Sequence, residues 1–234
     1  FCAWLLNRCE QDKVEKILFS SRDGYLFHKS FEVIRKYIQD ETVMPESKYF
    51  YASRMAYTMM SLYTEDDVRF VFELAYDGTI EDMLRDRFRI QSNKIEKYDG
   101  TTSEDKWQYV RKYIPQILEN SKNYRENFYK YLDNLGMDID NRTAFFDFVS
   151  SGTCHRCLQR TVGKKIPGYY FSYIYSKYTS EILDIKELFH TDFGCVSDSY
   201  VGNHYLFLEN IFSSIEPTLK EFDVEGQPVF VKED

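Results

Sequence analysis

Apolar residues at the start of the chain alternate between a short continuous run and a helical spacing. Residues 1–11 are predicted to be helical, and the run 14–20 indicates a buried strand that ends at a turn formed by Asp23 and Gly24. A helix is predicted over residues 25–38, because apolar side chains recur there at helical spacing: Leu26, Phe27, Phe31, Ile34 and Ile38. Strand, tight loop and helix therefore follow in the order of an α/β unit.

Further apolar runs predict the rest of a sheet. Residues 48–52 indicate a second strand, and residues 142–147 a third strand whose last residue is Asp147. A helix is expected from 154 to 162, and the next strand, 168–174, follows at a spacing suited to a parallel neighbour. A late helix over 199–213 and a terminal strand after a turn at 224–228 complete the prediction.

The stretch 57–136 has a different texture, with charged residues in helical periods and no convincing strand. We interpret it as a helical insertion or cap, which beside an active-site sheet would supply acceptor contacts and exclude water. A separate structural bundle is the alternative. The expected organisation is an α/β fold with a mainly parallel sheet, built from residues 1–56 and 137–234.

Composition narrows the classes of partner. The 234 residues carry 30 Lys and Arg against 38 Asp and Glu, a formal charge of −8, and no basic stripe that would suit duplex nucleic acid. An anionic ligand would therefore need a local pocket. Aromatic residues make up 18% of the chain, which is consistent either with surface rings that stack on sugars or with a compositional bias.

Cysteine, histidine and apolar patterns exclude several kinds of site. The five Cys are scattered, as is typical of reduced thiols in a cytoplasmic protein, and the pair Cys154 and Cys157 has no second pair to complete a zinc site. No apolar run reaches membrane-spanning length and no signal peptide opens the chain, which begins at Phe1 as if cut from a longer protein. His155 and Arg156 are expected either to touch a ligand or to be solvated.

The segment from Asp147 to Thr153 joins an acid to a small, hydroxyl-rich turn that opens a helix. Gly152 lets the backbone approach a ligand closely, while Ser150, Ser151 and Thr153 offer hydroxyl donors. Free amides at the start of the next helix favour an anion. Asp147 would accept hydrogen bonds from ribose hydroxyls or position a metal-bound ligand. A simple N-capped helix is the alternative.

A second loop, Ser20 to Gly24, also follows an apolar strand and precedes a helix. In a parallel sheet both loops would open on the same carboxyl edge, where α/β folds place ligands. Ser20, Ser21 and Arg22 can hold the charge of a diphosphate, and Asp23 and Gly24 supply a sharp turn. A solvated surface turn is the alternative. Arg54, at the end of the second strand, is a candidate for a third phosphate contact, or else part of a structural ion pair.

Three short motifs carry a family resemblance: residues 19–26, residues 51–54 and residues 147–153. The last of these resembles the ribose-phosphate loop of type I phosphoribosyltransferases. Together they resemble the glycan phosphoribosyltransferase domain that accompanies haloacid-dehalogenase-like phosphatases in bacterial polysaccharide biosynthesis. The family loop usually begins with two adjacent acids, whereas Phe146 precedes Asp147 in this chain.

The resemblance implies a Rossmann-like fold of the phosphoribosyltransferase type and a function. The chain would transfer 5-phosphoribosyl from phosphoribosyl pyrophosphate (PRPP) to a saccharide hydroxyl, a step in adding ribofuranose to a surface polysaccharide. Residues 20–24 would hold the pyrophosphate with Mg²⁺, Asp147 the ribose, and residues 150–153 the 5-phosphate. A haloacid-dehalogenase-like phosphatase is the implied partner, and the general base is left open among Asp23, Asp192 and Asp198.

Two other functions are weighed against this one. A phosphatase of the haloacid dehalogenase type needs a nucleophilic carboxylate two residues before its general acid, but Ser21 stands two residues before Asp23. A degenerate module that binds a sugar phosphate or nucleotide and scaffolds the phosphatase is the stronger alternative, because the second acid of the ribose loop is missing. P-loop and nucleophile-elbow motifs are absent from the sequence.

Overall fold

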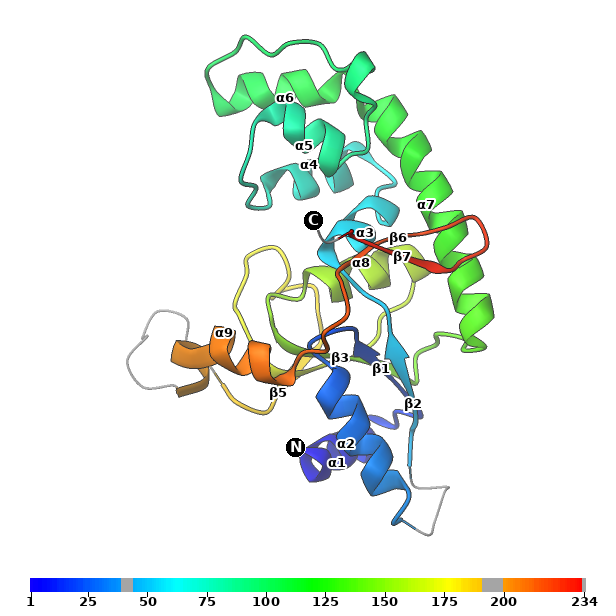
Figure 1. The fold of residues 1–234 in the computed structure, drawn as a ribbon. Coiled ribbons are helices and arrows are strands. Elements are labelled where there is room, and N and C mark those ends of the chain that lie inside the picture. The colour runs from blue at the N-terminus through cyan, green and yellow to red at the C-terminus, as the bar shows by residue number, and fades with distance from the viewer. Residues whose placement is uncertain (39–43, 191–199, 233–234) are drawn as a thin grey trace. The chain divides into compact units, whose positions relative to one another are not determined.

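The computed structural model describes residues 1–38, 44–190 and 200–232, and the chain divides into two compact units (Figure 1). The first consists of Phe1–Ser53, Asp138–Thr218 and Val231–Asp234, and the second of Arg54–Met137 and Leu219–Phe230. The expected helical stretch 57–136 falls within the second unit. Residues 219–230, which were expected to close the α/β core, also belong to the second unit.

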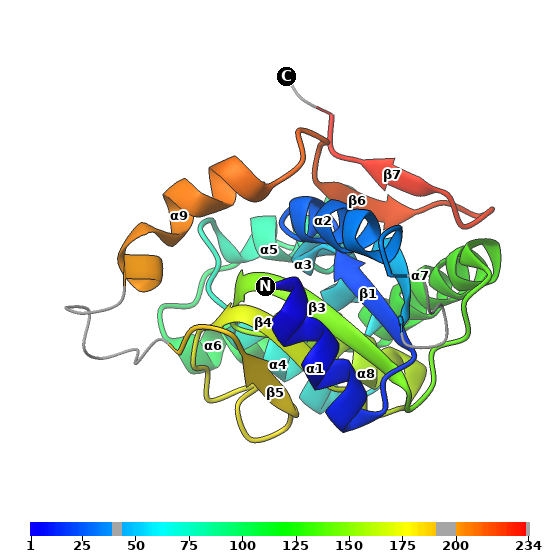
Figure 2. The same ribbon diagram turned by 90° about the horizontal axis from the view of Figure 1, so that it is seen from below.

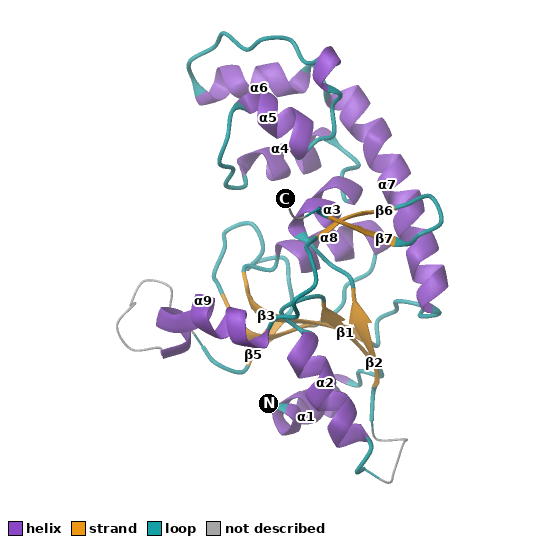
Figure 3. Cartoon of the chain, in the orientation of Figure 1, coloured by secondary structure: helices purple, strands orange, loops and turns teal. Residues whose placement is uncertain are grey.

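Within the described residues, the first unit contains a five-stranded sheet in which every pairing is parallel (Figure 3). The strand order is β2-β1-β3-β4-β5, and the strands are β1 (Lys16–Ser20), β2 (Glu46–Phe50), β3 (Thr143–Ser150), β4 (Gly168–Tyr173) and β5 (Ile185–Glu187). The α/β fold class predicted from the sequence is confirmed. The first six residues of β3 are all buried, as expected for a strand covered on both faces.

Helices cover both faces of this sheet (Figures 1 and 2). On one face, α1 (Cys2–Asp12) and α2 (Tyr25–Arg35) pack through an aromatic core in which the Phe27 and Phe146 rings lie 5.1 Å apart. On the other, the His155 ring of α8 (Thr153–Val162) stacks on Phe145 at 5.6 Å. The last helix, α9 (Tyr200–Phe212), adds Phe212 to the first face and is kinked at His204.

Helices make up most of the second unit. They are α3 (Arg54–Met60), α4 (Glu65–Glu73), α5 (Ile80–Asp86), the 3-10 turn η1 (Ser92–Lys94), α6 (Ser103–Arg111) and α7 (Ile114–Leu135). Three of them begin with reciprocal capping boxes, formed by the pairs Thr64 and Asp67, Thr79 and Asp82, and Thr102 and Asp105. Each box satisfies two helix-end amides that would otherwise lack partners.

A C-terminal hairpin completes this unit. Strands β6 (Leu219–Phe222) and β7 (Pro228–Phe230) pair in antiparallel fashion, and the Phe222 ring stacks on Tyr131 of α7 at 4.3 Å. Asn127 of α7 also donates to the Phe222 carbonyl at 2.9 Å. The predicted terminal strand is therefore half of a hairpin. None of the described helices combines the length and apolarity needed to cross a bilayer.

Candidate functional site

The two predicted loops follow neighbouring strands. Phe19 of β1 lies opposite Phe146 of β3, so the end of β1 is level with Asp147. The sheet order places β2 on one side of β1 and β3 on the other, and this reversal of direction is where open α/β sheets bind ligands. The sequence prediction that both loops open on one carboxyl edge is consistent with this topology. Asp147 is not the last residue of its strand, however, since β3 continues to Ser150.

Asp147 is a buried carboxyl group that accepts hydrogen bonds. Its Oδ1 accepts hydrogen bonds from the Ser20 hydroxyl at 2.7 Å and from the Phe148 amide at 3.0 Å. Burial, followed by the negative charge of Asp23, raises the pKa of Asp147 to about 6, although bonds from Ser20 and Ser150 oppose this rise. Near neutral pH this side chain can therefore both donate and accept a proton.

The loop after β3 has the form of an anion site. Gly152 has φ 76° and precedes α8, and its amide donates to the Ser150 hydroxyl at 3.0 Å. Gly152, the N-cap residue of α8, makes no side-chain capping hydrogen bond, and the start of a helix favours an anion. The positive φ of Gly152 favours glycine, and a Cβ there would also lie 2.7 Å from the end of the Leu183 side chain.

Hydrogen bonds from Thr179 and around His155 support the loop after β3. The Thr179 hydroxyl donates to the Ser151 carbonyl at 2.6 Å. His155 is fully buried, contrary to the expectation of a solvated or ligand-touching side chain, and its Nε2 lies 2.9 Å from the Ile166 carbonyl. Its Nδ1 lies 3.1 Å from the Tyr170 hydroxyl, and burial lowers the pKa of His155 to about 4. The histidine is therefore a neutral support under the loop.

The loop after β1 is a tight turn in which Gly24 is required. Its amide donates to the Ser20 carbonyl at 2.9 Å, and a Cβ on Gly24 would approach that same oxygen to 2.4 Å. The Ser21 hydroxyl donates to the Ala52 carbonyl at 2.9 Å, which ties the loop to the end of β2. Arg22 adopts the left-handed conformation with φ 64°, an unfavourable backbone state for a residue with a Cβ.

The side chain of Arg22 reaches the segment that follows α9. Its Nη1 donates to the Thr218 hydroxyl at 2.8 Å. Arg22 also lines a pocket of about 240 Å³, together with Ser214, Ile215, Glu216, Pro217, Thr218 and Val231. The predicted pyrophosphate loop thus has a neighbour that sequence patterns did not reveal.

Asp23 is the second carboxyl group of the site. It is half-buried, and burial raises its pKa, while a hydrogen bond from Ser213 and the charge of Arg22 lower it. Glu209 of α9 lies near enough that the charge of Asp23, after burial, raises its pKa as well. Sequence analysis missed Glu209, because nothing in the spacing of α9 distinguishes it from an ordinary helical glutamate.

The structure gives no contact between this cluster and three further candidates named from the sequence. Arg54 is an exposed residue of the second unit, where it begins α3 and its charge, after burial, lowers the pKa of Arg87. Asp192 and Asp198, which were considered as general bases, lie outside the described residues. Asp23 is thus the candidate base whose surroundings the structure describes.

A Mg²⁺ ion would find only part of its ligands here. Carboxylates are suitable ligands, and Asp147 and Asp23 are close enough to influence one another. Within residues 1–38, 44–190 and 200–232, no group of three or more His, Cys, Asp or Glu side chains is arranged to hold a metal ion. The residues present therefore fit an ion held mainly by phosphate oxygens of a ligand, with one or both of these carboxylates contributing.

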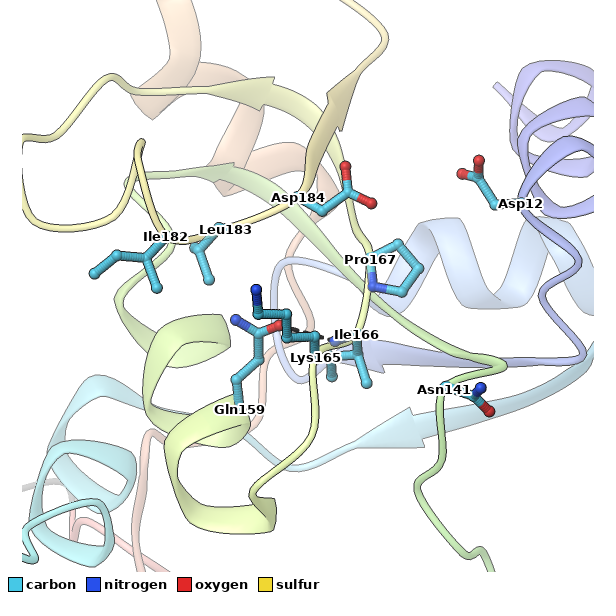
Figure 4. Close-up of a pocket in the computed structure, with 9 residues that line it drawn as sticks. All are labelled: Asp12, Asn141, Gln159, Lys165, Ile166, Pro167, Ile182, Leu183 and Asp184. Atoms are coloured by element: carbon cyan, nitrogen blue, oxygen red, sulfur yellow. Dashed lines mark hydrogen bonds between the residues drawn. The ribbon is translucent and has the colours of Figure 1, made fainter.

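A larger pocket, of about 500 Å³, lies elsewhere on the first unit (Figure 4). Its lining residues include Asn141, Pro167 and Asp184, which precede β3, β4 and β5 respectively. It therefore opens at the amino edge of the sheet, opposite the edge that carries the two loops. Lys165 lines it as well, and the Gln159 side chain accepts a hydrogen bond there from the Ile166 amide at 2.8 Å.

Comparison with known proteins adds no family assignment. No protein-family model matches the chain, and no curated protein matches it either.

Proposed function

We propose that the first unit binds PRPP at the β1/β3 edge and transfers its 5-phosphoribosyl group to a saccharide hydroxyl, releasing pyrophosphate. The observation that carries this proposal is the hydrogen bond between Ser20 and Asp147. Ser20 begins the loop after β1, whose glycine turn is suited to a diphosphate. Asp147 lies in β3, and the loop after β3 is suited to a phosphate. A phosphorylated sugar with a second phosphate-bearing group is the ligand that needs both loops at once.

Each part of the donor would meet a matching group. The 5-phosphate would lie against Ser150, Ser151, Gly152 and Thr153, where helix amides and hydroxyls favour an anion. The ribose hydroxyls would donate to Asp147. The pyrophosphate would lie against residues 20–24, where Mg²⁺ would offset its charge and so make it a better leaving group.

The reaction exchanges one bond to the anomeric carbon for another. The bond from C1 of ribose to the pyrophosphate oxygen breaks, and a bond from C1 to the acceptor oxygen forms, while the acceptor proton passes to a base. Positive charge develops on the ribose in between, and the carboxylate of Asp147 would stabilise it. Asp23, whose pKa is raised by burial, would take the proton.

The wider assignments follow from the resemblance and are part of the proposal. The acceptor would belong to a surface polysaccharide under construction in the cytoplasm. A haloacid-dehalogenase-like phosphatase would then remove the 5-phosphate to leave ribofuranose.

Thermal-shift titration tests the donor site directly. PRPP with Mg²⁺ at about one hundred times its dissociation constant should stabilise the protein by about 2.7 kcal/mol, which raises the melting temperature by about 5–11 °C. Asp147→Asn should abolish most of this shift, whereas Asp138→Asn, a change at an exposed carboxyl group, should retain it. Ribose 5-phosphate should compete.

Three results would count against the proposal. No shift with PRPP would reject the donor assignment, and an equal shift in the Asp147→Asn protein would place the ligand elsewhere. PRPP binding without acceptor-dependent pyrophosphate release, tested over a panel of saccharides, would favour the alternative of a sugar-phosphate-binding scaffold.

A further inference from the structure

Residues 213–218, the segment after α9, are hydrogen-bonded to the loop after β1. The Ser214 amide donates to the Arg22 carbonyl at 3.0 Å, and the Ser213 hydroxyl donates to Asp23. The Arg22 guanidinium in turn donates a hydrogen bond to the Thr218 hydroxyl. Contacts between groups nearly 200 positions apart in sequence thus cover the loop that we assign to pyrophosphate.

Glu216 makes the most informative of these contacts. Its carboxylate accepts a hydrogen bond from the Tyr49 hydroxyl, and the Arg22 amide points to the same carboxylate oxygen at 3.4 Å and to the Tyr49 oxygen at 2.6 Å. Burial and this carboxylate raise the pKa of Tyr49, so the phenol keeps its proton and acts as the donor. A carboxylate of the chain therefore already lies against the Arg22 amide of the proposed pyrophosphate loop and against the Tyr49 hydroxyl of β2.

We infer that Glu216 is an internal anion that occupies the pyrophosphate subsite, and that residues 213–218 must release the loop before a diphosphate can bind. The inference rests on the proposed function, because it names the group that the donor would displace. The chemistry required of the incoming ligand is that of a Mg²⁺-bound diphosphate.

The described contacts make such a release feasible. Ile215, the central apolar residue of the segment, is fully exposed, with a relative exposure of 102%, so its side chain adds no buried apolar surface. The segment is held instead by hydrogen bonds, each of which contributes little net free energy when water can replace the partner. Release would free the Tyr49 hydroxyl to donate to a phosphate oxygen, while the Arg22 amide would stay bonded to the Tyr49 oxygen at 2.6 Å.

Calorimetric titration with pyrophosphate and Mg²⁺ tests the competition. Glu216→Gln keeps the size of the side chain and an acceptor for Tyr49 but removes the charge, so its dissociation constant for pyrophosphate should fall at least threefold. Glu181→Gln, an equal change of charge at an exposed position of the first unit, should leave the dissociation constant unchanged. An unchanged or weaker affinity in Glu216→Gln would overturn the inference.

Hydrogen exchange measured by mass spectrometry tests the release itself. Pyrophosphate should speed amide exchange in residues 213–218 of the parent protein, and slower exchange there would overturn the inference by showing that the segment closes over the ligand. Without ligand, Glu216→Ala should also speed exchange in these residues, and unchanged exchange would overturn the fastening role of Glu216. Faster exchange in this variant combined with no pyrophosphate binding would retain the role of Glu216 and reject the proposed function.

Discussion

The Ser20 hydroxyl donates a hydrogen bond of 2.7 Å to Asp147, across 127 positions of sequence. It is a contact between the last residue of β1 and the middle of β3, the two strands that carry the candidate site. Because each residue leads into one of the two loops, the bond couples the position of one loop to the charge on the other strand. A substitution at Ser20 or at Asp147 should therefore affect both loops.

Replacing Ser20 by Ala should raise the pKa of Asp147 further above its value of about 6. The hydroxyl donates to the charged carboxylate, so its loss disfavours the ionised form. Carbon-13 NMR titration of the aspartate carboxyl groups measures this shift. Ser172→Ala removes another buried hydroxyl, which donates to the Phe189 carbonyl, and should cost similar stability, about 1–2 kcal/mol, without moving the Asp147 titration.

Asp147 should make the protein less stable as pH rises from about 4 to about 6. The folded state binds the proton more tightly than the unfolded state, so deprotonation in this interval favours unfolding. A difference of about two pKa units corresponds to about 3 kcal/mol. In Asp147→Asn this contribution disappears.

Urea unfolding at pH 4 and pH 7.5 measures the effect. The unfolding free energy of the Asn variant minus that of the parent protein should be larger at pH 7.5 than at pH 4. An identical pH dependence in both proteins would contradict the raised pKa.

Gly152→Ala should destabilise the protein more than Gly163→Ala. Both glycines flank α8 and have positive φ, so alanine costs about 1 kcal/mol of backbone strain at each. At Gly163 a Cβ would have nothing within 4 Å, whereas at Gly152 it would meet Leu183 at 2.7 Å. Denaturant unfolding gives the two free energies, and titration with inorganic phosphate should show weaker binding only for Gly152→Ala. Equal effects of the two changes would mean that the loop adapts to the extra carbon.

His155 should carry its proton on Nε2. The Ile166 carbonyl can only accept, so Nε2 donates to it and Nδ1 accepts from the Tyr170 hydroxyl. Nitrogen-15 NMR of the imidazole distinguishes the two tautomers. A protonated Nδ1 would contradict this network.

The same histidine should make the fold sensitive to acid. Its pKa is about 4 in the folded state and about 6.5 when unfolded, so stability should fall as pH drops from about 6.5 to about 4. This trend is opposite in sign to that of Asp147. Urea unfolding in the Asp147→Asn background isolates it, and a stability that stays level over this interval would contradict the lowered pKa.

Local patterns were sufficient to predict four of the five described strands of the parallel sheet and the two loops. The apolar runs at 14–20 and 142–147 each lead through a glycine-containing loop into a helix, and such repetition specifies neighbouring parallel strands. Strand β5 was missed because it has three residues, all half-buried, which is too short for any period to appear. Hairpin strand β6 was missed for a similar reason.

Contacts of long range were beyond sequence patterns. Glu209 and Glu216 meet Asp23 and Arg22 respectively only because α9 returns to the first face of the sheet. His155 was misjudged because helix position alone does not show which side of α8 faces the sheet. Charged side chains in such places have no local spacing that separates them from solvated ones.

The membership of residues 219–230 in the second unit has a consequence for synthesis on the ribosome. The bond from Tyr124 to Glu221 spans 97 positions, so α7 emerges long before the hairpin that packs on it. At about 5–20 residues per second, the helical unit waits roughly 5–20 s for its last strands. During that time the Tyr131 surface that Phe222 will cover is uncovered, and a chaperone that shields aromatic surfaces has its opportunity to act.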